Sequence, residues 1–199
     1  QKIKRMLSGE SAFCEMVTYS FISPNFVKML SLDEADKRTA TINLINPLGE
    51  ELSIMRTTLM HSMLSTIAYN NSRGNHKGRL FEIGRVYFPK KLPLDDIANE
   101  YETLALASYG EYSGFYELKA TLEMIAKAFN IELKFKPSCE PYLHPGRSAD
   151  VFISSECVGY IGEIHPTTAE NYEIDNNATV SEINLELFLK HAIEFLPFK

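Results

Sequence analysis

The sequence predicts an α+β fold with a mainly antiparallel sheet flanked by helices. Strand-like runs rich in β-branched and aromatic residues follow one another through short turns, which is typical of hairpins. Amphipathic helix patterns stand before, between and after these runs. The composition, 45% hydrophobic and 23% charged over 199 residues, is that of a globular protein able to bury a large core.

The first half of the chain contains one long helix pattern and several short elements. Residues 56–74 carry an apolar stripe at Leu59, Met63 and Ile67, with a neighbouring apolar row beside it. Further helices are predicted over residues 2–7 and, from the start signal Ser23-Pro24, over 24–32; strands are predicted over 15–23, 41–47 and 79–88.

The second half alternates strands with three helices and contains a hairpin. Residues 115–130 form an amphipathic helix pattern with Leu118, Leu122 and Ile125 on its inner face. The run 149–164 predicts a hairpin that turns near Ser154–Glu156. The remaining predictions are strands over 103–108, 131–136 and 178–186, a short helix opened by Pro166, and a final helix over 185–193.

The strand "RLFEIGRVYF" is apolar on both faces and still carries charged residues. Apolar residues on both faces indicate a strand that is covered on both sides, so we expect Phe81–Tyr87 in the central strand of the sheet. Buried charges need partners. We therefore predict that Glu82 and Arg85 are structural, each with a charged or backbone partner.

Charge and cysteine content narrow the function classes. The net charge is -6, but the segment Arg73–Lys91 is locally basic, which fits either contact with phosphate or an acidic partner or a solvated loop and strand end. The three cysteines (Cys14, Cys139 and Cys157) are far apart and form no CxxC pair, so we expect no disulfide framework or zinc site and a reducing, cytoplasmic setting. No apolar run approaches the roughly 20 residues that span a bilayer, so no membrane contact is expected.

The segment "LHPGRSAD" is the main candidate for chemistry by residue type. His144, Arg147 and Asp150 lie close together in it, and Glu163 and His165 form a similar His-Pro group later in the chain. This pattern fits acid–base chemistry or a metal site only weakly, and it also fits a rigid loop. We favour the loop, turned by its Pro-Gly pair, with Arg147 bound to a carboxylate or to backbone carbonyls.

Six segments together resemble class II aminoacyl-tRNA synthetases and, more closely, the synthetase-like domain of the bacterial phenylalanyl-tRNA synthetase β subunit family. They occur in the family's order and cover nearly the whole chain. The segments are "EMVTYSFISP" (15–24), "NPLGEELSIMRTTLMHSML" (46–64), "NNSRGNHKGRLFEIGRVYF" (70–88), "FYELKATLE" (115–123), "LHPGRSADV" (143–151) and "GYIGEIHP" (159–166).

The resemblance also implies that the adenylation site is missing. Tyr19 stands where the first class II motif has Pro, and Phe88 and Lys90 stand where the second has its ATP-binding Arg and its Glu. The third motif ends in an Arg that opens a helix, whereas the only Arg in residues 101–199 is Arg147, and a strand pattern follows it. We therefore expect no catalytic, cofactor-binding or metal-binding residue in this chain.

By resemblance, the chain is a catalytically silent domain that packs on the α subunit. The whole enzyme, an (αβ)₂ assembly, uses ATP and Mg²⁺ to charge tRNA(Phe) with phenylalanine in the cytoplasm. Residues 1–190 are the expected domain, 191–199 the expected start of a linker to a further module, and an exposed apolar patch is expected at Ile3, Met6 and Leu7. The structural or interface candidates are Glu82, Arg85, Arg56, His144, Arg147 and Tyr19.

Two alternatives stay open at this point. The chain could be an active ATP-dependent adenylating ligase with a rebuilt site, in which Arg56, Arg85 and Arg147 supply the phosphate contacts. It could instead bind tRNA directly through the basic segment Arg73–Lys91.

Overall fold

The computed structural model describes residues 1–9, 11–92 and 96–192, and it contains one large sheet. The strand order is β1-β4-β5-β9-β8-β7-β6, and every neighbouring pair is antiparallel except the parallel pair β1–β4. The strands are β1 (Cys14–Glu15), β4 (Gly78–Phe88), β5 (Asn99–Tyr109), β6 (Leu133–Pro137), β7 (Leu143–Ile153), β8 (Glu156–Ile164) and β9 (Ala178–Asn184); β2 (Phe21–Ile22) and β3 (Ile54–Met55) form a separate two-stranded ladder. The predicted α+β fold with a mainly antiparallel sheet is confirmed.

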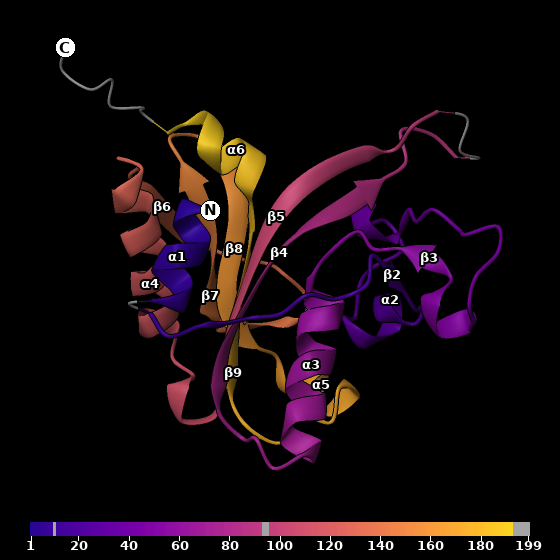
Figure 1. Cartoon of the computed structure of the whole chain (residues 1–199), viewed down its shortest axis with the longest axis horizontal. Helices are drawn as coiled ribbons and strands as arrows, with labels where there is room; N and C mark the ends of the chain where they lie inside the picture. Colours follow the sequence, from indigo (N-terminus) through magenta and orange to yellow (C-terminus); the bar gives the residue numbers. More distant parts are fainter. Residues whose placement is uncertain (10, 93–95, 193–199) are drawn as a thin grey trace.

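Helices cover both faces of the sheet, and the sheet separates two hydrophobic cores, one on each face (Figure 1). One face packs against α1 (Lys2–Ser8), α4 (Phe115–Ala128) and α6 (Leu185–Lys190). The other face packs against α2 (Phe26–Met29), α3 (Met60–Ser72) and α5 (Pro166–Asn171), and the β2–β3 ladder lies beside α2 in a lobe at one end. Three 3₁₀ turns complete the described elements: η1 (Lys37–Thr39), η2 (Glu50–Leu52) and η3 (Gly110–Tyr112).

The apolar stripes predicted on the two long helices are the residues that these helices bury. Met63 and Ile67 of α3 are fully buried, and Leu118 and Ile125 of α4 are each only 1% exposed. Burial of one such side chain contributes roughly 1.5–3 kcal/mol, so these stripes hold the helices on the sheet. The hairpin turn is also confirmed, because β7 and β8 join at Ser154, whose φ is 56°.

The prediction that Phe81–Tyr87 lies in the central strand is wrong. The middle position of the seven-stranded sheet belongs to β9, whereas β4 is next to the edge strand β1. The two residues of β1 pair with Leu80 and Phe81, and further along, the Tyr87 amide donates to the carbonyl of Arg56 (2.9 Å). Apolar residues on both faces of a strand indicate that helices cover both faces of the sheet at that strand. They do not indicate how many other strands lie to either side of it.

Three further segments differ from the sequence predictions. The strand expected over 15–23 is split into β1 and β2, and 41–47 forms only an isolated bridge from Asn43 to Ile54. "LHPGRSAD" is not a loop but part of β7, with a register irregularity between Leu143 and Ser148. Pro145 cannot donate to a ladder, and an irregularity of this kind lets a strand continue past such a residue. The linker expected over 191–199 lies outside the described residues from 193 onward.

The apolar side of the amino-terminal helix is buried rather than exposed. Ile3 is 5% exposed and Leu7 is fully buried, and both belong to the core beneath α4, with Met6 packed against it. The exposed apolar patch expected at these three residues is therefore wrong, because the apolar side of α1 completes the core. Among the described residues, no helix combines the length and apolar character needed to cross a membrane.

Candidate functional site

Two buried carboxylates lie in one row that runs across the sheet. The strand registers place Glu82 opposite Ala105, Ala105 opposite Glu182, and Glu182 opposite Tyr160. Directly opposed residues in neighbouring strands project from the same face. Glu82 and Glu182 therefore point to the same side of the sheet, the side of α3, with one small alanine between them.

Glu82 is closed into an ion pair with Arg56. The Arg56 Nη1 donates to Glu82 Oε1 (2.9 Å), and the two side chains are 4% and 3% exposed. Thr18 Oγ1 donates to the other carboxylate oxygen (2.8 Å), and Arg56 Nε donates to the carbonyl of Arg85 (2.8 Å). A Cβ on Gly84 would lie 2.3 Å from Arg56 Nη2, so a glycine is needed here. Glu82 therefore has the charged partner that the sequence predicts.

Glu182 receives three hydrogen bonds, all from neutral groups. Thr58 Oγ1 (2.7 Å), the Leu59 amide (2.8 Å) and Tyr160 Oη (2.5 Å) all donate to its carboxylate. Thr58 and Leu59 directly precede α3, so the carboxylate satisfies a free amide at the start of this helix, where negative charge is also favoured. The segment "RTTL" (56–59) thus lies over the row of residues that joins Glu82 to Glu182, and it is hydrogen-bonded to both carboxylates.

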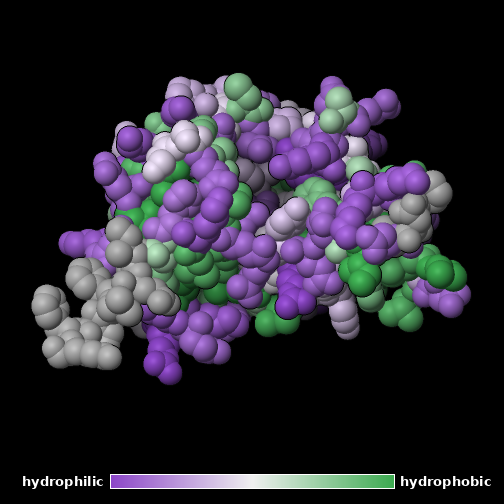
Figure 2. All heavy atoms as spheres, turned by 90° about the horizontal axis from the view of Figure 1, so that it is seen from above, coloured by the Kyte–Doolittle hydropathy of each residue, from purple (hydrophilic) through white to green (hydrophobic). Residues whose placement is uncertain are grey.

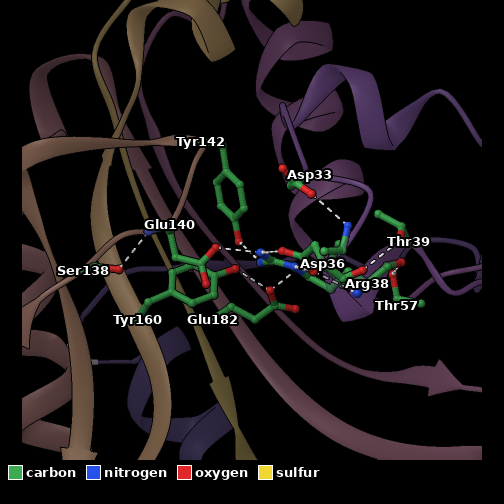
Figure 3. A network of polar contacts seen from close by, with 12 residues as sticks. Asp33, Asp36, Arg38, Thr39, Thr57, Ser138, Glu140, Tyr142, Tyr160 and Glu182 are labelled. Carbon is green, nitrogen blue, oxygen red and sulfur yellow. Dashed lines mark hydrogen bonds and ion pairs between the residues drawn. The ribbon is translucent and has the colours of Figure 1, made fainter.

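A second charged cluster, centred on Arg38, lies next to Glu182 (Figure 3). The Arg38 guanidinium donates to Asp36 Oδ2 (2.6 Å), Glu140 Oε2 (2.8 Å) and Tyr142 Oη (2.8 Å). The hydrogen bond from Arg38 lowers the pKa of Asp36. Burial raises the pKa of Glu140 and outweighs the opposing effect of Arg38. Burial also raises the pKa values of Tyr142 and Tyr160 well above 10, so both phenols stay neutral.

Asp36, Arg38, Glu140, Tyr160 and Glu182 line a cavity of about 910 Å³ on the α3 side of the sheet. Val86, Phe88 and Tyr101, from the adjoining strands β4 and β5, line the cavity further along the same face of the sheet. The rings of Phe88 and Tyr101 meet edge to face, with centroids 6.0 Å apart. The cavity therefore has an aromatic part and a part rich in carboxylates.

Arg85 has the predicted partner but not the predicted burial. It is exposed, and its Nη1 donates to Glu100 Oε2 (2.8 Å) on β5. Arg85 lies near the end of β4, where β4 and β5 extend past the helices that cover the sheet (Figure 1). The apolar pattern predicts that β4 is covered along its whole length, but the helices do not cover this end of the strand.

The remaining candidates of "LHPGRSAD" have local partners. Arg147 Nε pairs with Glu163 Oε2 (2.9 Å), which confirms the predicted carboxylate partner. His144 Nδ1 accepts from the Gly146 amide (3.1 Å), and His165 Nδ1 accepts from the Thr167 amide (3.2 Å), capping α5. Within the described ranges, no three His, Cys, Asp or Glu side chains are grouped so that they could hold a metal ion.

Tyr19 is solvent-exposed, and much of the basic segment is neutralised. Tyr19 is 73% exposed, and Val17 beside it is 86% exposed. In the basic segment, pairs form between Lys77 and Glu111, between Arg85 and Glu100, and between Lys90 and Asp96, while Arg73 and Arg79 lie over the rings of Tyr69 and Tyr112.

The residues that sequence reasoning missed are those of the cavity wall. Glu182 stands alone in the apolar strand β9, so the argument used for Glu82 would have found it. Arg38 lies in a polar stretch that resembles any solvated loop, and no sequence signal marks it. Glu140 and Tyr142, which precede β7, and Tyr160 on β8 are brought to it only by the tertiary fold.

Comparison with known proteins gives the family. Residues 1–185 match the family model described as the phenylalanyl tRNA synthetase beta chain CLM domain. The chain is 39% identical over 198 residues to the phenylalanine–tRNA ligase beta subunit of Clostridium tetani, 33% identical over 196 to that of Clostridium acetobutylicum and 32% identical over 197 to that of Syntrophus aciditrophicus. These matches cover 96%, 96% and 94% of this chain, which spans about a quarter, 24%, of each relative. The chain belongs to the phenylalanyl tRNA synthetase beta chain CLM domain family.

Proposed function

We propose that this chain is a catalytically silent, class II synthetase-like domain of a phenylalanine–tRNA ligase β subunit. In this proposal the domain packs on the α subunit, which activates phenylalanine with ATP and Mg²⁺, and it supports the (αβ)₂ assembly that charges tRNA(Phe) in the cytoplasm. The observation that carries the proposal is the position of Phe88. This phenyl ring lines the cavity where the family resemblance expects an ATP-binding Arg. A phenyl ring cannot stabilise the charge that develops at the α-phosphate.

The charge of the cavity supports the same conclusion. Its walls carry Asp36, Glu140, Asp150 and Glu182 against Lys37 and Arg38. The Arg38 guanidinium is already engaged by two carboxylates and a phenol. A triphosphate entering this cavity would meet an excess of negative charge, which costs free energy in a partly buried site.

The alternative of a rebuilt adenylating site has little support. Arg56 is buried and bound to Glu82, Arg85 points to Glu100 at the strand end, and Arg147 pairs with Glu163. None of these three arginines lines the cavity. Direct tRNA binding is likewise weakly supported, because carboxylates already neutralise several cations of the basic segment.

For packing on the α subunit, we propose the exposed apolar residues of the lobe around β2 and β3. Val17 and Tyr19 lead into β2, and Ile45 and Leu48, 96% and 87% exposed, precede β3. Figure 2 shows hydrophobic surface at the end of the molecule that this lobe forms. Exposed apolar side chains in such number favour a protein-binding surface.

The packing proposal can be tested by co-purification with the α subunit. The variant Tyr19→Asp places a charge on the lobe, and Tyr116→Asp is a matched control, because Tyr116 is 79% exposed on α4 at the other side of the molecule. We expect Tyr19→Asp to lose the α subunit and Tyr116→Asp to retain it, with equal melting temperatures. Equal retention by both variants, or equal loss, would contradict this surface.

A further inference from the structure

We propose that a second, smaller cavity at the start of α4 binds a compact zwitterion, an ammonium group and a carboxylate carried on a short aliphatic body. This cavity, called the α4 cavity below, has a volume of about 180 Å³ and is lined by residues of β4, β5, η3 and α4. A cavity of about 150 Å³ accommodates a benzene ring, so this one takes a molecule of similar size. The inference goes beyond the proposed function and does not depend on it.

The sheet contributes a buried hydroxyl group to the α4 cavity that the protein does not satisfy. Ser108 lines the cavity and is 2% exposed, and within the described ranges its Oγ has no hydrogen-bond partner. Thr179, which lies opposite Ser108 in the pairing of β5 with β9, bonds instead to the hydroxyl of Ser113 (3.1 Å). A buried hydroxyl without a partner costs free energy, which a hydrogen-bonding ligand would recover.

Two opposite charges line the same cavity, and neither is neutralised by the protein. Arg79 lies opposite Ser108 in the register of β4 and β5, so both side chains project from the α4 side of the sheet. The Arg79 guanidinium donates to the carbonyl of Ser11 (3.2 Å) and lies over the ring of Tyr112, which leaves most of its donors free. Glu117 lies at the exposed rim of the cavity, in the first turn of α4. Over the described part of the chain, neither Arg79 nor Glu117 has an ion-pair partner.

A zwitterion would satisfy all three of these groups. Its carboxylate fits the planar guanidinium of Arg79, with the Ser108 hydroxyl as a further donor, and its ammonium group fits the carboxylate of Glu117. Phe13 and Leu118 also line the cavity and supply apolar surface for a short aliphatic body. Glu117 would repel a simple anion, and Arg79 would repel a simple cation. A small ligand that carries both charges is therefore favoured over a ligand that carries only one.

The first test compares alanine with its two half-molecules on the full chain. L-Alanine, propionate and ethylammonium are titrated by calorimetry at fixed pH and ionic strength, and L-phenylalanine serves as a zwitterion that is too large for the cavity. We expect L-alanine to bind at least about ten-fold more tightly than each of the other three probes. Equal affinity for alanine and any of the other probes would overturn the proposal. So would the absence of saturable alanine binding at millimolar concentration, which would leave ordered water as the partner of Ser108.

Variants then assign the binding to the α4 cavity. Ser108→Ala is expected to weaken alanine binding about five-fold or more without lowering the melting temperature, because the hydroxyl that it removes has no partner in the described protein. Glu117→Gln is expected to weaken binding about ten-fold, and it decides the outcome if Ser108→Ala does not fold. Glu123→Gln, further along α4 and outside the cavity, is the matched control and should bind alanine as the parent does. Unchanged binding in Glu117→Gln or in a folded Ser108→Ala, or equal weakening in Glu123→Gln, would place the probe elsewhere and overturn the proposal.

Discussion

Glu82 and Glu182 occupy equivalent positions in the sheet and have opposite surroundings. Both point to the α3 side from one transverse row, with Ala105 between them, and they are 2% and 9% exposed. Glu82 is bound by the guanidinium of Arg56, whereas Glu182 is held by neutral donors and lines a cavity. A buried carboxylate is therefore neutralised by an ion pair at Glu82, whereas at Glu182 it is bound by neutral groups and faces a cavity.

The difference shows how one short segment organises this face. Arg56 reaches Glu82, and Thr58 and Leu59 reach Glu182, so the residues before α3 fix the start of the helix over the sheet. Only the Glu82 end is neutralised by charge. The Glu182 end leaves a partly solvated, negatively charged wall, and the energetic consequences of changing the two ends should differ accordingly.

The largest expected effect comes from breaking the Glu82 end. Arg56→Met removes the cation and leaves Glu82 buried without its counter-ion, which should destabilise the fold by roughly 3–5 kcal/mol. Urea unfolding followed by circular dichroism measures the change. Adding Glu82→Gln to Arg56→Met should recover a large part of the loss, because the second change removes the unpaired charge. A double variant that is less stable than Arg56→Met would show that the ion pair is not what holds this end.

A pH effect of comparable size should come from His61 on α3. Burial lowers the pKa of this imidazole to about 4, and its Nδ1 lies 2.8 Å from Tyr172 Oη. Because the folded protein resists protonation that the unfolded chain accepts, stability is fully present above about pH 6.5 and is lost as the pH falls toward 4. The loss should be on the order of 2–3 kcal/mol at its maximum.

Melting curves of the parent and of His61→Gln between pH 7 and pH 4 isolate the His61 contribution. The parent should lose stability more steeply than the variant over this range. Parallel losses would mean that other groups cause the pH dependence and that His61 titrates normally.

Changing the Glu182 end should have a smaller effect on stability than Arg56→Met. Glu182→Gln keeps the size and one acceptor oxygen, but its amide group cannot accept from all three donors, so we expect a loss of about 1–2 kcal/mol. Chemical denaturation alongside Arg56→Met gives the comparison directly. A loss as large as that of Arg56→Met would mean that Glu182 depends on a charge interaction which its neutral partners do not explain.

The smallest effect is expected at Arg147, whose pair with Glu163 lies near the surface. The Arg147 side chain is 55% exposed, and exposed pairs contribute little because water and salt screen them. Arg147→Ala should change the free energy of unfolding by less than about 0.5 kcal/mol. A change above 2 kcal/mol in urea unfolding would show that this pair anchors the irregular part of β7.

The sequence predicted the parts of this account that depend on local pattern. The stripes of α3 and α4, the turn at Ser154 and the buried charge of Glu82 each follow from residue type and spacing. The cavity could not be predicted in this way, because its charged residues come from separate parts of the chain: the segment around η1, the segment before β7, β7 and β9. "LHPGRSAD" misled for a related reason: Pro and Gly usually mark a turn, and here the strand continues past them through an irregular register.

The proposal of a silent site is tested most directly by ATP–pyrophosphate exchange with phenylalanine. We expect no exchange by this chain alone and normal exchange when the α subunit is present. In that complex, Phe88→Ala in this chain should leave the exchange rate unchanged, because Phe88 cannot stabilise charge at the α-phosphate and the cavity takes no part in the proposed reaction. Exchange by the chain alone, or a complex whose rate falls with Phe88→Ala, would contradict the account.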